Sequence, residues 1–172
     1  MPQSLPERAA APPAVAARRG SATRTAMMRL LVAASLVLSI TALPVVDLKK
    51  DTYETVASST GTPWLIEVYS GMCESCKAYE KVWHALETKL EGHAGFGLGR
   101  INMDDNLGSA LAMKFDDLLA GGIPAVLWVA DAAKPYLYTM VDKGNAKSGK
   151  ELWQALKKAA PEAATIIAKK EL

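Results

Sequence analysis

The two cysteines are the residues whose type and spacing could do chemistry. Cys73 and Cys76 are the only cysteines of the chain and stand three positions apart, between a strand-like run at 64–69 and a helical pattern that begins near Cys76. A Cys-X-X-Cys at such a junction places both sulfurs on the first helical turn, where unpaired N–H groups and the helix dipole favour a thiolate. The pattern predicts a dithiol that reversibly forms a disulfide.

Two other uses of a cysteine pair fit less well. A structural zinc site takes about four ligands, and beyond the cysteines the chain offers only His84 and His93 as soft ligands, at a spacing unlike that of zinc fingers. A purely structural disulfide across two residues closes too short a loop to stabilise the fold much. We therefore expect a redox-active pair and no metal.

An acidic residue interrupts the strand before the cysteines. The run 64–69 is otherwise apolar, as expected of a strand covered by helices on both faces, and Glu67 lies in its middle. Burial should raise the pKa of Glu67 and let it exchange a proton with Cys76. The alternative is that Glu67 points into solvent from an edge strand.

Three stretches in order resemble the thioredoxin superfamily, and protein disulfide isomerase domains in particular. Residues 64–77 resemble the active-site strand and turn, 100–106 the third strand, and 122–124 (Gly-Ile-Pro) the loop that carries the family's cis-proline. Three ordered motifs are more specific than a lone Cys-X-X-Cys. The resemblance, which covers about 45–160, implies an α/β thioredoxin fold with a central mixed β-sheet flanked by helices on both faces.

The roles of the site residues follow in part from position and in part from the resemblance. Cys73, at the exposed helix start, is expected to attack, and Cys76, one turn deeper, to resolve the mixed disulfide. The resemblance assigns proton transfer to the acid at Glu67. Arg100 stands where relatives often have a lysine that pairs with this acid, and a permanent cation would hold Glu67 more firmly ionised.

Three further residues are expected to contact substrate. The resemblance implies a cis peptide before Pro124, packed against the sulfurs, with the backbone of Gly122 and Ile123 free to pair with an extended client. Met72 replaces the tryptophan that usually precedes the first cysteine, and it offers a flexible apolar contact.

Other departures from the family pattern concern the redox balance. Glu74 and Ser75 stand between the cysteines, where isomerases usually carry Gly-His and thioredoxins Gly-Pro. Glu74 opposes a thiolate and Ser75 offers only a neutral hydrogen bond, so we expect a less oxidising pair than in a typical isomerase. Gly121 stands where many isomerase domains carry an arginine that tunes the resolving cysteine, which predicts slower reoxidation.

Composition indicates one domain behind a targeting segment. The 172 residues can bury a real core without disulfide staples. The formal net charge of +2 includes the arginine-rich residues 1–42; from 43 onward 15 basic and 17 acidic residues give −2, which does not argue for nucleic acid. No internal repeat is visible, so we expect a single thioredoxin-like domain over 43–160.

The two ends of the chain carry targeting signals. The apolar core 30–42 of the segment 1–42 suits a signal peptide and is short for a membrane span of ~20 residues, although an uncleaved anchor stays an alternative. The arginine-rich leader also resembles a transit peptide. The tail 161–172 ends in Lys-Lys-Glu-Leu, which resembles the Lys-Asp-Glu-Leu retrieval signal.

The expected order of elements is β-α-β-α-β-α-β-β-α. Capping boxes should begin helices at Asp51 and Ser148, and Pro161 should end the last helix, with a helical or frayed tail beyond it. The remaining strands are expected at 45–48, 64–69, 125–130 and 136–141, with a third strand that starts within the Gly-rich stretch 92–99 and continues into 100–106. Helices are expected at about 76–90 and 107–115.

Together these features predict a monomeric thiol-disulfide oxidoreductase that acts on cysteine-containing client proteins. We expect no cofactor, membrane contact only during targeting, and electron exchange with a redox partner or glutathione. The endoplasmic-reticulum lumen is the favoured location, with a plastid or thylakoid lumen, or secretion, as alternatives. Two other functions stay open: a thioredoxin-like reductase of an organelle lumen, and a client-binding chaperone module whose cysteines are incidental.

Overall fold

The computed structural model describes residues 44–90, 93 and 95–168. The expected targeting segment 1–42 and the final four residues of the retrieval-like tail lie outside the described residues. No helix of the described part is long and apolar enough to cross a membrane.

The centre of the fold is a five-stranded mixed sheet with the spatial order β1-β3-β2-β4-β5. β1, β3 and β2 run parallel, whereas β4 is antiparallel to β2 and β5 to β4. The strands are β1 (Val46–Asp47), β2 (Trp64–Tyr69), β3 (Gly97–Asn102), β4 (Ala125–Val129) and β5 (Tyr138–Asp142). The strand that precedes the cysteines is therefore central, and the predicted mixed sheet is confirmed.

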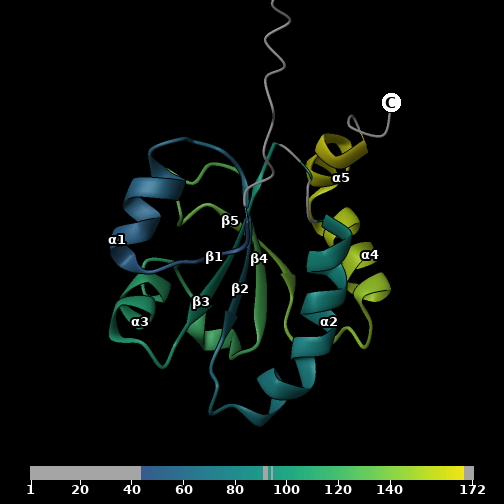
Figure 1. The fold of residues 1–172 in the computed structure, drawn as a ribbon, viewed down its shortest axis with the longest axis horizontal. Helices are drawn as coiled ribbons and strands as arrows, with labels where there is room; N and C mark the ends of the chain where they lie inside the picture. The colour runs from purple at the N-terminus through teal and green to yellow at the C-terminus, as the bar shows by residue number, and fades with distance from the viewer. Residues whose placement is uncertain (1–43, 91–92, 94, 169–172) are drawn as a thin grey trace, which may run out of the picture. The chain divides into compact units, whose positions relative to one another are not determined.

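Helices cover both faces of this sheet (Figure 1). α1 and α3 lie on one side, and α2, α4 and α5 lie on the other. The helices are α1 (Lys50–Thr52), which continues as a π-helix (Tyr53–Ser58), α2 (Glu74–Leu90), α3 (Asn106–Ala112), a 3₁₀ turn (Leu119–Gly121), α4 (Gly149–Ala159) and α5 (Pro161–Ala168). The predicted α/β arrangement with two covered faces is confirmed.

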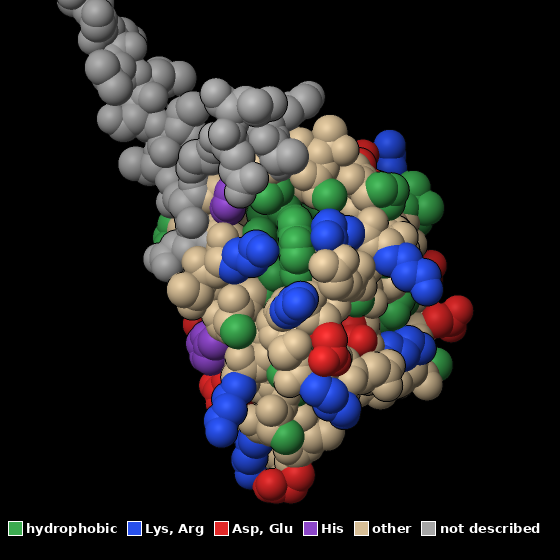
Figure 2. Space-filling view, turned by 90° about the vertical axis from the view of Figure 1, so that its right-hand side faces the viewer, with side chains coloured by type: hydrophobic (Ala, Val, Ile, Leu, Met, Phe, Trp, Pro, Cys, Tyr) green, Lys and Arg blue, Asp and Glu red, His purple; other side chains and the backbone are tan. Residues whose placement is uncertain are grey.

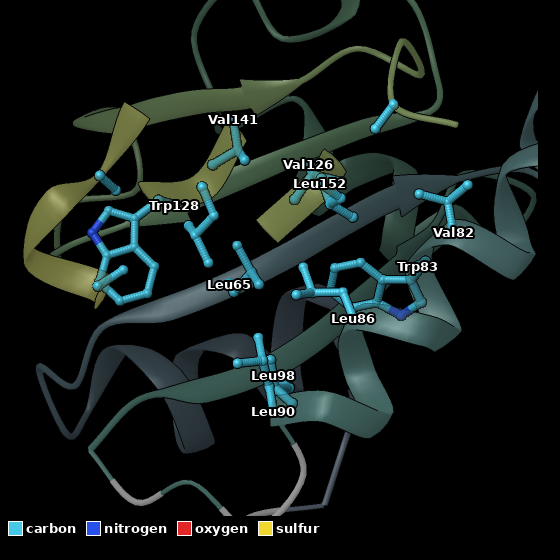
Figure 3. Packing of buried hydrophobic residues seen from close by; sticks show 14 of the residues in the cluster. Leu65, Val82, Trp83, Leu86, Leu90, Leu98, Val126, Trp128, Val141 and Leu152 are labelled. Atoms are coloured by element: carbon cyan, nitrogen blue, oxygen red, sulfur yellow. The ribbon is translucent and has the colours of Figure 1, made fainter. Parts of the chain in front are cut away.

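The alternation of side chains along β2 divides the core into two layers. Trp64, Ile66 and Val68 join the cluster under α1 and α3, while Leu65 joins the cluster under α2 and α4. In that second cluster the labelled side chains of the strands and of α2 and α4 lie together (Figure 3). Because the side-chain period of a strand is two, Glu67 shares the face of Leu65 and lies on the α2 side, toward the cysteines.

The first predicted capping box begins earlier than expected. Lys49, not Asp51, is the cap residue of α1, and its N–H donates to the Thr52 hydroxyl at 2.7 Å. Threonine can replace an acid as the reciprocal acceptor, so a pattern search for Glu or Gln three positions on misses this box. The helix after β5 begins at the predicted cap, since the Ser148 hydroxyl accepts the N–H of Glu151 at 3.2 Å. The predicted box is not reciprocal, because the Glu151 carboxylate accepts the N–H of Lys147 at 2.9 Å and not that of Ser148.

Pro161 separates two helices. α4 ends at Ala159, and Pro161 is the first residue of α5, where a residue without an N–H costs nothing. Ala163 and Ile167 of α5 are buried in the same cluster as α2 and α4. The part of the tail from 161 to 168 is thus a packed helix.

Candidate active site

Cys73 occupies the place of an N-cap residue of α2. The turn 70–73 follows β2, and Glu74 is the first helical residue. The Cys73 sulfur accepts the N–H of Cys76 at 3.2 Å, as a serine or aspartate cap accepts from the third helical residue. A capping sulfur is held next to unpaired N–H groups, which stabilise a negative charge on it.

The thiol of Cys73 is accessible and activated. Its side chain is partly exposed, and its sulfur lies 3.0 Å from the Ser75 hydroxyl. Burial alone would raise the pKa of Cys73, but hydrogen bonds from Cys76 and Ser75 outweigh it and hold the pKa below its ordinary value. Ser75 therefore supports the thiolate as a hydrogen-bond donor, without adding a charge.

The thiol of Cys76 has the opposite character. Its residue is 4% exposed, and burial together with the neighbouring Cys73 raises its pKa to about 11. Both cysteines are free thiols in the structure. One turn of helix therefore carries an accessible thiol that ionises readily and a buried thiol that needs a base to lose its proton.

Glu67 is fully buried beside an arginine. Register places Glu67 opposite Arg100 on the neighbouring β3, and Arg100 Nε donates to Glu67 Oε2 at 2.7 Å. The Arg100 guanidinium lies 4.2 Å from the ring centroid of Tyr69. Because Glu67 is on the central β2 and has no exposed area, the edge-strand alternative is wrong.

Burial decides the protonation of Glu67. Desolvation raises the pKa of Glu67 to about 7, although the charge and hydrogen bond of Arg100 act in the other direction. Its second oxygen, Oε1, is buried and has no hydrogen-bond partner in the described part of the chain. The direction of the shift is the one predicted from burial, and Arg100 favours the ionised form, also as predicted; proton transfer to Cys76 stays a prediction.

A small pocket lies between Arg100 and the resolving thiol. It has a volume of about 70 Å³, and its lining includes Cys76, Arg100, Tyr69, Ser70 and Glu80. A polar site of this size has room for water. Water in it would give protons a path between the buried thiol and solvent.

The loop before β4 lies against the active thiol. The Ile123–Pro124 peptide is cis, as the resemblance implied, and Pro124 is buried. The Ile123 carbonyl lies 3.8 Å from the Cys73 sulfur and 3.4 Å from the Ser75 hydroxyl. Gly122 is exposed with φ +75°, and Met72 is 80% exposed, so the predicted substrate-contact residues lie on accessible surface around the thiol.

Solved structures share this architecture. No family model matches the chain, and no curated protein matches its sequence. The J-Trx1 fragment of ERdj5 matches with a TM-score of 0.50 and 16% identity over 67% of this chain, which spans 51% of that fragment. The Trx4 domain of ERdj5 matches with a TM-score of 0.47 and 19% identity over 75% of this chain and 97% of that domain.

The chain has a thioredoxin fold. The match to the J-Trx1 fragment, the mixed sheet covered on both faces, and the cis-proline beside the dithiol agree in this. In this thioredoxin fold the cysteines lie at the junction of the central strand β2 with α2.

Asp104 is a site residue that the sequence interpretation missed. One carboxylate oxygen accepts the Ser70 hydroxyl and the other the Gly71 N–H, both at 2.6 Å. The Ser70 hydroxyl in turn accepts the Met72 N–H at 3.1 Å. Asp104, in the loop after β3, therefore holds the turn that presents Cys73 from outside the helix.

The space beside Gly121 is occupied by a cation. A side chain at Gly121 would collide with the ammonium group of Lys143, which belongs to the turn after β5. The sequence suggested that a positive charge is lost at this loop. In the folded chain a positive charge is nevertheless present there, supplied by Lys143, 22 positions further along the chain.

The two histidines do not join the cysteines as a group of ligands. Within the described residues no three or more His, Cys, Asp or Glu side chains gather in a way that could hold a metal ion. His84 Nδ1 lies 2.8 Å from Glu87 on the surface of α2.

Proposed function

We propose that the protein is a thiol-disulfide oxidoreductase of the protein disulfide isomerase kind, acting on cysteine-containing client proteins. The observation that carries the proposal is the division of one dithiol into an accessible thiol of lowered pKa and a buried thiol whose pKa is raised to about 11. A pair of this kind can both attack a disulfide and release the adduct.

In the reducing direction the Cys73 thiolate attacks one sulfur of a client disulfide. The client S–S bond breaks, a Cys73–client disulfide forms, and the second client sulfur leaves as a thiolate. Cys76 then loses its proton and attacks the Cys73 sulfur. The Cys73–Cys76 disulfide forms, and the client leaves with two reduced sulfurs. The same steps in reverse oxidise a client dithiol.

Glu67 is suited to take the proton from Cys76. The thiol at about pKa 11 is almost wholly protonated near neutral pH, so its attack needs a base. Glu67, whose pKa is about 7, is available in both protonation states there. Because no cofactor is needed for this exchange, the dithiol is itself the redox centre.

The place of action belongs to the same proposal. The signal-like residues 30–42 and the Lys-Lys-Glu-Leu end support the endoplasmic-reticulum lumen, where glutathione or a redox partner would exchange electrons with the pair. The Arg-rich leader keeps a plastid or thylakoid lumen as the alternative, where a reductase would be expected.

The reduction potential of the Cys73–Cys76 pair tests the proposal. The full chain is equilibrated in glutathione buffers, and the two states are separated by thiol alkylation and mass. We expect a value below the roughly −180 mV of protein disulfide isomerase, because Glu74 and Ser75 stand where isomerases usually carry Gly-His. A value near the roughly −270 mV of thioredoxin would favour the reductase. Failure to form a reversible disulfide would overturn both enzymes.

A client-binding module with incidental cysteines is the second candidate. The observation that favours it is Met72, whose 80% exposure beside the loop of Ile123 offers an adaptable apolar contact. A double Cys73→Ser, Cys76→Ser variant separates the two functions. Suppression of client aggregation survives in this variant only if the protein is such a module.

A further inference from the structure

An open groove adjoins the active thiol on the α2 side. It has a volume of about 210 Å³. Ser75, Ala78, Tyr79 and Val82 of α2 form one wall, and Gly144, Ala146 and Lys147 of the loop between β5 and α4 form the other. Ser75 also contacts the Cys73 sulfur, so a segment joined to Cys73 would pass directly into this groove.

The second wall is held by a buried acid. Asp142 Oδ2 accepts the Tyr79 hydroxyl at 2.8 Å and the N–H groups of Asn145 and Ala146 at 3.0 and 3.2 Å. Gly144, with φ +71°, lies so close to Pro124 that a side chain there would press on the proline ring. The groove, the loop of Pro124 and the thiol therefore adjoin one another, and the Asp142 hydrogen bonds hold the second wall in place.

Two lysines stand free along this surface. Lys143 and Lys147 are exposed and enter no ion pair within the described residues. The Lys143 ammonium lies over Gly121, next to Gly122 in the loop that meets Cys73. Lys147 is on the groove wall itself.

The acids near the groove are already engaged. Glu74 accepts from the Lys77 ammonium at 2.6 Å, and Glu151 accepts from the backbone N–H of Lys147 at 2.9 Å. Basic side chains are spread among acidic ones over the face of α2, α4 and α5, so the number of lysines on that face indicates nothing by itself (Figure 2). What distinguishes Lys143 and Lys147 from the other lysines without an ion pair is their position: Lys143 lies over Gly121, in the loop that leads to Ile123, and Lys147 lines the groove that Ser75 also lines.

We propose that Lys143 and Lys147 select client segments that carry an acidic side chain next to the reacting cysteine. The segment lies extended past the loop of Ile123, places an apolar side chain in the groove, and pairs its carboxylate with the lysines. This inference rests on the proposed oxidoreductase function and specifies its substrate class. The selectivity acts through charge complementarity, which the unpaired ammonium groups supply.

Three matched peptide disulfides test the inference. They differ only in the residue next to the cysteine, which is Glu, Gln or Lys, and kcat/KM for reduction by the full chain is measured for each at low and at high salt. Because an exposed ion pair is a weak interaction, we expect the Glu peptide to exceed the Gln peptide by about 2- to 5-fold, and the preference to shrink at high salt. The Lys peptide should be the slowest.

Variants connect the preference to the two lysines. Lys143→Gln and Lys147→Gln should each reduce the Glu-to-Gln ratio, and Lys143→Glu should reverse it. Lys150→Gln, a matched exposed lysine in the first turn of α4, should leave the ratio unchanged. Equal kcat/KM for all three peptides, or a ratio that Lys143→Glu does not alter, would overturn the inference alone. Reduction of none of the peptides would instead count against the proposed function.

Discussion

The environments of Cys73 and Cys76 differ more than their spacing suggests. Both sulfurs belong to the first turn of α2, yet one accepts a helix N–H at the surface and the other lies in the interior. Three residues rotate a helix by about 300°, so the two side chains meet different surroundings. Two residues of the same type therefore differ in proton affinity because the fold gives them different surroundings, which is what the proposed two-step exchange needs.

The same contrast holds for the groups around them. The turn that presents Cys73 is fixed by Asp104 from the loop after β3, and the exposed Lys143 lies over Gly121 in the loop before β4. Cys76 is buried, and Glu67, whose charge acts on it, is paired with Arg100. The proposed recognition of clients would use the exposed side, and the proposed proton transfer the buried side.

The largest expected effect is the difference between the two cysteines in trapping clients as mixed disulfides. A Cys76→Ser variant should accumulate mixed disulfides with client proteins, because attack proceeds and release does not. A Cys73→Ser variant should accumulate almost none. The adducts are measured by non-reducing electrophoresis and mass spectrometry after an acid quench. The reverse pattern would exchange the two roles and break the comparison.

The buried acid should make stability depend on pH. In the unfolded chain Glu67 titrates near 4.5, whereas burial raises its pKa in the folded protein to about 7. The contribution of protonated Glu67 is complete below pH 4.5 and is lost as the pH rises through 7. The free energy of unfolding of the wild type, relative to Glu67→Gln, should therefore fall by about 3 kcal/mol between pH 4.5 and 8.

Urea unfolding of both proteins at several pH values measures this difference. The substitution also changes stability in ways that do not depend on pH, such as the different packing of an amide beside Arg100. These effects shift the difference equally at every pH and cannot imitate a change confined to the window from 4.5 to 7. A difference that stays constant across this window would mean that Glu67 keeps an ordinary pKa.

The same acid should accelerate release of the mixed disulfide. If Glu67 takes the Cys76 proton, the rate of release in the wild type rises with pH through about 7. The Glu67→Gln variant should lose that rise and be slower by roughly 100-fold at pH 7.5. Acid-quenched single turnovers with a peptide disulfide measure the rate. Glu54→Gln, which changes an exposed acid of the helix after β1, is the control.

The smallest expected effect concerns Asp104, which holds the exposed turn before Cys73. Asp104→Ala should lower the free energy of unfolding by about 1 kcal/mol, because water can replace part of the lost hydrogen bonds at an exposed site. In a double-mutant cycle with Ser70→Ala, the double variant should lose less stability than the sum of the losses in the two single variants. Strict additivity would show that the contact carries no energy. Asp116→Ala, in an exposed loop, controls for the loss of an acid.

The sequence was sufficient for most of the fold because local signals and global architecture agree. The apolar run of β2, the helical stripe after Cys76 and the order of the three resembling stretches all place the dithiol where the structure has it. The burial of Glu67 was also predictable, since an acid within an apolar strand has few other environments.

What the sequence did not reveal depends on contacts between distant segments. Nothing local in Asp104 shows that it meets Ser70, 34 positions earlier, because a loop acid usually faces solvent. The position of Lys143 over Gly121 likewise needs β4 and β5 to be paired first. The earlier start of α1 at Lys49 depends on a threonine hydroxyl that serves as a cap partner only once the helix exists.

The four tryptophans have a practical consequence for optical work. Three of them are at most 1% exposed: Trp64, Trp83 and Trp128. The fourth, Trp153, is on α4. Met72 precedes Cys73, at the position where relatives usually have a tryptophan. The emission of this protein should therefore follow the integrity of its interior, and the turn 70–77 carries no indole that could signal a change in the oxidation of the sulfurs.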